Sequence, residues 1–253
     1  MIRLVTVPCV EFNLARLIAA ISEAHPDRVA LVHKSKQISF PTFVERYRRF
    51  GSALNASGLS CRVERSELEG HMSGQDHVAL FLNNECEYLE SMLGAWAGRV
   101  ASFNVNHRYI ADELHYLLTD ADAKAVVVNS MYAPNLAEVL PQLPNLGLIV
   151  QVPDESGNGL LPGAIYYEDF LREQEPRDLD DCSPDDLYLL YTGGTTGMPK
   201  GVLWRNADFF VGALGGLDRK TGLDYDSYAE VASAAARGTI KWMTSAPFMH
   251  GAA

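Results

Sequence analysis

Two kinds of hydrophobic pattern alternate along the chain. Apolar residues three and four positions apart predict helices around 14–21, 43–54, 89–96, 114–118 and 136–143. Continuous apolar runs at 28–32, 78–82, 125–128, 146–152 and 187–191 predict buried strands. Ser39 can cap the second helix, and Pro41 suits its first turn. Strands separated by helices of this length imply crossover connections, so we predict an α/β fold with a mostly parallel sheet and flanking helices.

Two segments interrupt this alternation. Residues 60–75 are charged and have no clear period, and residues 153–163 have the composition of turns. In residues 183–186, Ser-Pro-Asp-Asp predicts a capped helical turn in a solvated linker rather than a metal site.

Composition and charge restrict the classes of function. Of the 253 residues, 47% are hydrophobic and 21% are charged, which is typical of a globular protein. The net charge of −11 argues against nucleic acid as a partner, and any anionic ligand needs a local site. No apolar run is long enough for a membrane span, and the interrupted apolar start does not predict a secretion signal.

The cysteines do not form a recognisable framework. Cys9, Cys61, Cys86 and Cys182 are widely separated and include no C-x-x-C pair, so reduced thiols in a cytoplasmic protein are expected. Cys61 has nearby histidines, but their spacing is not that of zinc ligands.

The segment with recognisable chemistry is 192–201, which reads TGGTTGMPKG and follows an apolar strand. Glycines allow backbone N–H groups to face an anion, threonine hydroxyls donate hydrogen bonds, and Lys200 adds a point charge suited to phosphate. It is not the common G-x-x-x-x-G-K-[ST] loop, since Met198 and Pro199 separate Gly197 from Lys200. These residue types favour phosphate binding; the alternative is a Gly-Thr-rich surface loop.

Residues 192–201 resemble the phosphate-loop signature of the AMP-forming adenylating enzymes, a superfamily of acyl-CoA synthetases, adenylation domains and luciferases. Gly193 stands where many members have serine. Residues 98–127, with the run FNVNHRYIADEL, and residues 247–251, PFMHG, resemble two further family motifs in the same order. The likeness is closest to the acyl-CoA synthetase branch, the fatty-acid–CoA ligases, and it covers nearly the whole chain.

This resemblance implies that the substrates are ATP, coenzyme A and a carboxylic acid with a fatty or bulky acyl group, and that Mg²⁺ is required. In the family, the carboxylate attacks the α-phosphorus of ATP, pyrophosphate leaves, and the thiol of coenzyme A then displaces AMP. Lys200 and His250 are the implied catalytic residues: Lys200 neutralises pyrophosphate and His250 orients the acid. Thr192 is also an implied Mg²⁺ contact. The implied cofactor-binding residues are Thr192, Gly193, Gly194, Thr195, Thr196, Gly197 and Lys200.

The chain also departs from the family pattern. The family's later glutamate, which binds Mg²⁺, its ribose-binding aspartate and its mobile C-terminal domain do not occur in 1–253. The resemblance therefore implies the N-terminal portion of an adenylating domain, truncated near the histidine motif and inactive alone. Apolar surface left uncovered predicts self-association or a complementing C-terminal chain.

Alternatives to an enzyme fragment remain open. They are a non-catalytic remnant that binds phosphate groups or a partner enzyme, and one half of a split ligase. The segment 60–75 is longer than its counterpart in the family, and we expect a surface loop there, with partner binding as the alternative.

Overall fold

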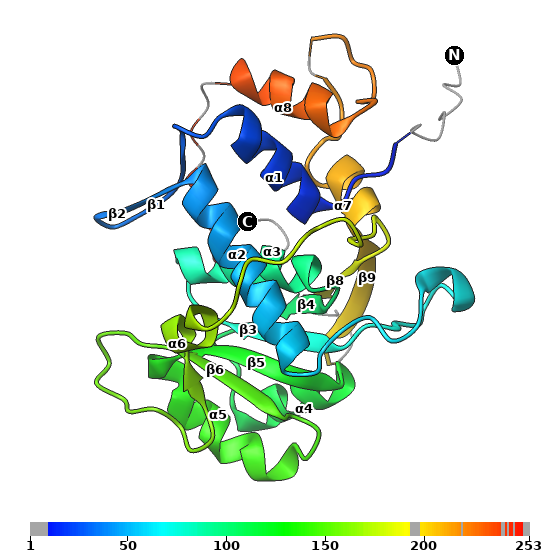
Figure 1. Ribbon diagram of the computed structural model, residues 1–253. Coiled ribbons are helices and arrows are strands. Elements are labelled where there is room, and N and C mark those ends of the chain that lie inside the picture. The colour runs from blue at the N-terminus through cyan, green and yellow to red at the C-terminus, as the bar shows by residue number, and fades with distance from the viewer. Residues whose placement is uncertain are drawn as a thin grey trace.

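The computed structural model describes residues 10–192, 198–218, 220–238, 241, 243–244 and 246–249. Within these residues a seven-stranded sheet, in the order β7-β6-β5-β3-β4-β8-β9, carries helices on both faces (Figure 1). All neighbouring strands are parallel except the antiparallel pair β8–β9. The prediction of an α/β fold with a mostly parallel sheet is confirmed. The strands are β3 (His77–Phe81), β4 (Ala101–Asn104), β5 (Ala123–Asn129), β6 (Leu148–Val152), β7 (Ile165–Tyr166), β8 (Leu187–Thr192) and β9 (Lys200–Arg205).

The helices cover the sheet in two layers, and one further group packs beside it. α4 and α5 cover one face, whereas α2, α3 and α6 cover the other. α1, α7 and α8 pack together with α2 and α3 in a third hydrophobic cluster. The helices are α1 (Leu14–Ala24), α2 (Phe40–Ala56), α3 (Cys86–Ala97), α4 (Ala111–Asp120), α5 (Ala133–Val139), α6 (Tyr167–Arg172), α7 (Asn206–Gly212) and α8 (Tyr228–Ala236).

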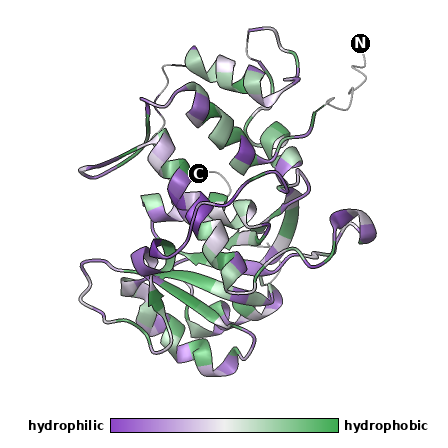
Figure 2. Cartoon of the chain, in the orientation of Figure 1, coloured by the Kyte–Doolittle hydropathy of each residue, from purple (hydrophilic) through white to green (hydrophobic). Residues whose placement is uncertain are grey.

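Side chains of the central strands alternate between the two faces of the sheet, as strand geometry requires. Phe81 and Val128 pack on the side of α4 and α5. Leu80 and Val127 pack against Phe50 of α2 on the other side. Figure 2 accordingly shows the strands in hydrophobic colours and much of the surrounding loop surface in hydrophilic ones.

Local signals in the sequence account for several element boundaries. The Ser39 hydroxyl accepts a hydrogen bond from the Thr42 backbone N–H at 3.4 Å, which confirms the predicted cap of α2. The helical spacing at 136–143 does not give one continuous helix, because α5 ends at Val139 and a 3-10 turn follows over Leu140–Gln142. Pro141 lies in this turn and has no N–H to donate, which explains the break.

The first predicted strand lies outside the main sheet. β1 (Val29–His33) pairs antiparallel with β2 (Lys36–Ser39) in a separate two-stranded sheet. Lys34 has a φ of 53° in the turn between them, a left-handed conformation that reverses the chain. Within the described part of the chain, no helix has both the length and the apolar character needed to cross a membrane.

Candidate functional site

The two ends of the predicted phosphate loop lie opposite each other. In the β8–β9 hairpin, Thr192 is the register partner of Lys200, and both side chains are exposed. The structure therefore brings together the threonine and the lysine that the sequence predicts as phosphate ligands. The other predicted loop residues, which connect the two strands in the sequence, lie outside the described residues; they are Gly193, Gly194, Thr195, Thr196 and Gly197.

Helix α4 holds both strands at the base of this loop. The Tyr191 hydroxyl donates to Asp120 Oδ2 at 2.8 Å, and the Tyr116 hydroxyl donates to the Pro199 carbonyl oxygen at 3.1 Å. Tyr116 and Asp120 are four residues apart and so lie on one face of the helix. Because Tyr191 precedes Thr192 and Pro199 precedes Lys200, the two contacts fix the chain on both sides of the loop.

The chemistry of Tyr191 suits this anchoring role. Burial and the neighbouring Asp120 carboxylate both raise the pKa of Tyr191 above its usual range, so the hydroxyl keeps its proton and continues to donate. Its ring lies against Gly201, where an added Cβ would come within 3.0 Å of Tyr191 Cζ. A side chain at 201 would therefore press on the Tyr191 ring, which would have to shift by a few tenths of an ångström.

Polar side chains gather where the parallel strands β3, β4 and β5 end. The Asn83 backbone N–H donates to Asn129 Oδ1 at 2.8 Å, and the Tyr132 hydroxyl donates to Asn83 Oδ1 at 2.6 Å. Asn129 also donates to Glu85, whose pKa burial raises above its usual value. In open parallel sheets ligands bind outside the carboxyl ends of the strands, and Thr192 ends β8, which neighbours β4.

The residues before His250 dock at the same edge. The Phe248 backbone N–H donates to Asn84 Oδ1 at 2.6 Å, and Asn84 Nδ2 donates to the Ala246 carbonyl oxygen at 2.9 Å. The Asn104 side-chain amide, at the end of β4, donates to the Met249 carbonyl oxygen. His250 itself lies outside the described residues, so its predicted role stays a prediction.

Sequence reasoning missed the residues that hold these two segments. Asn84 follows the predicted strand 78–82, and the carboxyl ends of neighbouring parallel strands lie at the same edge of a sheet, where ligands bind. Its position in the sequence could therefore have marked it as a candidate site residue. Tyr116, Asp120 and Tyr191 gave no such signal, because their meeting depends on how α4 packs beside β8. Among the described residues, no group of three or more His, Cys, Asp or Glu side chains could hold a metal ion.

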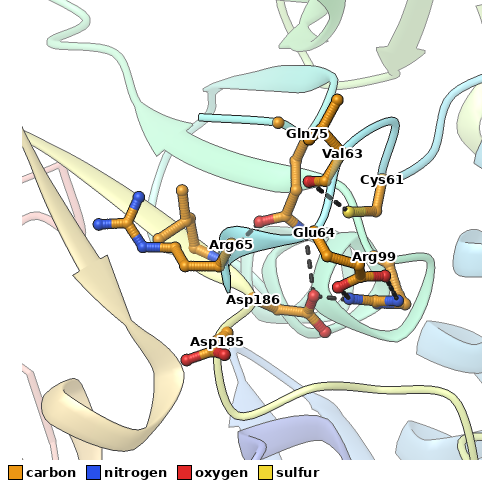
Figure 3. Close-up of a pocket in the computed structure, with 10 residues that line it drawn as sticks. Cys61, Val63, Glu64, Arg65, Gln75, Arg99, Asp185 and Asp186 are labelled. Carbon is orange, nitrogen blue, oxygen red and sulfur yellow. Dashed lines mark hydrogen bonds and ion pairs between the residues drawn. The ribbon is translucent and has the colours of Figure 1, made fainter. Parts of the chain in front are cut away.

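The charged segment 60–75 is tied to the opposite end of β8 through Arg99 (Figure 3). The Arg99 guanidinium donates to both carboxylate oxygens of Glu64 at 2.8 Å, and its Nε donates to Asp186 Oδ1 at 3.1 Å. Gln75 adds a second link, since its amide donates to Asp186 and accepts the Leu187 backbone N–H. The cavity between these groups measures about 10 Å³. It has room for about one water molecule and is too small for a larger ligand.

The expectation of a solvated linker at 183–186 is wrong for Asp186. Residues 184–185 do form a turn, but the Asp186 side chain is only 1% exposed. Burial raises the pKa of Asp186 to about 6, against the opposing effect of Arg99. Hydrogen bonds from Arg99, Gln75 and the Ser183 backbone N–H offset the free-energy cost of burying this carboxyl group.

Comparisons with known proteins concern the family and the fold. The family model described as AMP-binding enzyme matches residues 18–253. The medium-chain acyl-CoA ligase Mig of Mycobacterium avium is 45% identical over 96% of this chain and 44% of its own length. A medium/long-chain-fatty-acid–CoA/3-oxocholest-4-en-26-oate–CoA ligase of Mycolicibacterium smegmatis is 35% identical over 95% of this chain and 42% of its own length.

A solved structure shares the fold. The crystal structure of the anthranilate CoA ligase AuaEII in complex with anthranoyl-AMP matches with a TM-score of 0.68 and 20% identity, over 82% of this chain and 36% of that chain. The chain thus spans less than half the length of the curated relatives that it matches.

Proposed function

The chain belongs to the AMP-binding enzyme family, and from this we propose that it is the N-terminal part of an AMP-forming acyl-CoA synthetase. The complete enzyme activates a carboxylic acid with a fatty or bulky acyl group. Relatives named as medium- and long-chain acyl-CoA ligases support this substrate class. Since those relatives are more than twice as long as the chain, we assign the activity to the complete enzyme and not to residues 1–253 alone.

One observation carries the proposal. Thr192 and Lys200 lie opposite each other, exposed, at the carboxyl end of β8, and α4 braces the chain beside each of them. A hydroxyl and an ammonium group held at the loop end of a hairpin can bind the oxygens of one polyphosphate. The overall charge of −11 repels such a ligand, so a local positive group is required there.

The proposed reaction proceeds in two steps, formation of an acyl-adenylate and its conversion to the acyl-CoA thioester. A carboxylate oxygen of the acid attacks the α-phosphorus of ATP, and the bond to the departing pyrophosphate breaks. The thiol of coenzyme A then attacks the carbonyl carbon of the acyl-adenylate, loses its proton, and AMP leaves. Lys200 stabilises the charge that builds on pyrophosphate, and His250 orients the acid.

Mg²⁺ fits this site with Thr192 as a ligand. Mg²⁺ commonly keeps several waters and binds through one or two carboxylates plus substrate phosphates. On this chain the exposed Thr192 hydroxyl would be one ligand beside a bound triphosphate, and the glutamate that binds Mg²⁺ in the family does not occur in residues 1–253. The ion supplies charge neutralisation to the phosphates when it is bound.

Replacing Lys200 tests the proposal. In the complete enzyme, Lys200→Ala should lower the kcat of acid-dependent ATP–pyrophosphate exchange about 100-fold or more, because a preorganised charge is lost where negative charge develops. Lys124→Ala is the matched control, since Lys124 lies on β5 near its amino end and pairs with Asp122. Unchanged exchange in Lys200→Ala, or no exchange in the unaltered enzyme with any fatty acid, would contradict the proposed function.

A further inference from the structure

We propose that Asn84, supported by Tyr88 and Asn104, is a positioning residue that clamps the histidine motif to the carboxyl edge of the sheet. The proposal rests on the proposed function, because it assigns these three residues to the placement of His250. It goes further by naming side chains that determine this placement: Asn84 and Tyr88 lie outside all three family-like segments, and Asn104 lies in the segment 98–127.

Asn84 binds two separate backbone groups of the motif. Its Oδ1 accepts from Phe248 N–H at 2.6 Å while its Nδ2 donates to the Ala246 carbonyl at 2.9 Å. An amide that uses both its donor and its acceptor on one short segment fixes the orientation of that segment as well as its position. Asn84 lies between the end of β3 and the start of α3, so its own backbone is held by two regular elements.

Tyr88 supplies a third bond and an apolar contact. It lies in the first turn of α3, is 1% exposed, and donates from its hydroxyl to the Phe248 carbonyl at 3.2 Å. The rings of Tyr88 and Phe248 have centroids 5.1 Å apart. Phe248 is therefore held at its N–H, its carbonyl and its ring.

Asn104 completes the clamp at Met249. Its side chain is nearly buried at the end of β4, and its Nδ2 donates to the Met249 carbonyl oxygen. That carbonyl belongs to the planar peptide unit that joins Met249 to His250. Strand β4, helix α3 and the loop between β3 and α3 thus hold the chain up to Met249. A displacement of about 1 Å in a reacting group costs up to about 100-fold in rate, so the clamp has a kinetic consequence.

The test compares Asn84→Ala with a control asparagine in the complete enzyme. Asn55 also uses its amide to bind backbone, donating to the carbonyls of Leu59 and Gly98 at 2.8 Å each, but at the amino edge of the sheet. We expect the kcat of acid-dependent ATP–pyrophosphate exchange to fall about 10-fold or more in Asn84→Ala and to stay unchanged in Asn55→Ala. Tyr88→Phe, which keeps the ring contact, should lose only about threefold.

Repeating the Asn84→Ala substitution in the His250→Ala variant distinguishes a positioning role of Asn84 from a simple loss of stability. If Asn84 acts through His250, adding Asn84→Ala to His250→Ala should lower the rate no further, since coupled residues are not additive. Equal losses in both backgrounds, or the same kcat for Asn84→Ala and Asn55→Ala, would overturn the clamp while leaving the proposed function intact. If the unaltered enzyme shows no exchange, the proposed function fails, and the clamp fails with it.

Discussion

At the scale of single residues, the proposed phosphate loop depends on one close contact at its base. A Cβ at position 201 would lie 3.0 Å from Tyr191 Cζ and 3.2 Å from its hydroxyl oxygen. The φ of Gly201 is not in the positive region, so alanine there is opposed by the ring and not by the backbone. The ring must shift by a few tenths of an ångström to admit a methyl group.

We therefore predict that Gly201→Ala lowers the free energy of unfolding by about 1–3 kcal/mol, the usual cost of overpacking. It should also slow ATP–pyrophosphate exchange by the complete enzyme, because that shift weakens the bond from Tyr191 that steadies Thr192. Gly147→Ala is the control for urea unfolding, since nothing lies within 4 Å of a Cβ at 147. Equal stability of the two variants would contradict the contact.

Residue chemistry alone favoured a phosphate site in residues 192–201 with Lys200 as its charge, because glycine, threonine and lysine next to a strand are what such a site requires. The specific role of Thr192 came from the family resemblance. It could not predict the bond between Tyr191 and Asp120, which joins residues 71 positions apart in the sequence. A tyrosine in an apolar strand has the same local pattern whether its hydroxyl is buried against a helix or exposed to water.

At the scale of elements, periodicity identified most helices and buried strands but not their partners. β4 was missed because Ser102 and Asn104 interrupt its apolar run, although both side chains are buried. β1 was predicted as a strand, yet a run of five residues does not specify whether it joins the main sheet or pairs with β2. The buried charge at Asp186 was also missed, because its partner Arg99 is distant in the sequence.

The link between the segment 60–75 and β8 should depend on pH. Burial raises the folded-state pKa of Asp186 from its ordinary value of 3.8 to about 6, so the folded protein binds this proton more tightly than the unfolded chain does. The stability that the proton contributes is fully present below about pH 4 and is lost as the pH rises through about 6.

Asp186→Asn removes this titration and leaves the other groups in place. The free energy of unfolding of the unaltered protein, minus that of Asp186→Asn, should therefore fall by roughly 2–3 kcal/mol between about pH 4 and pH 7. Urea unfolding of both proteins across this range measures the difference. If this difference is constant with pH, or grows as the pH rises, then ionisation of Asp186 does not destabilise the folded protein.

At the scale of the whole molecule, apolar side chains are exposed along β9, α7 and the segment after it. Val202, Val211 and Leu214 are 44%, 47% and 56% exposed, and Leu223 is 64% exposed. Leu214 also lines a cavity of about 380 Å³ that lies between α7 and α8. Single exposed apolar residues need no explanation, but several on consecutive segments of the chain favour contact with another chain.

We predict that the isolated 253-residue chain associates through this surface. The net charge of −11 makes copies of the chain repel one another, so association should strengthen as added salt screens that repulsion. Sedimentation velocity should show species heavier than 27.8 kDa, and Leu214→Glu should shift them toward the monomer. Val32→Glu, at a residue 67% exposed on the separate two-stranded sheet, should not. If the chain stays a monomer at high protein and salt concentration, the prediction is wrong, because these apolar side chains then remain exposed to water.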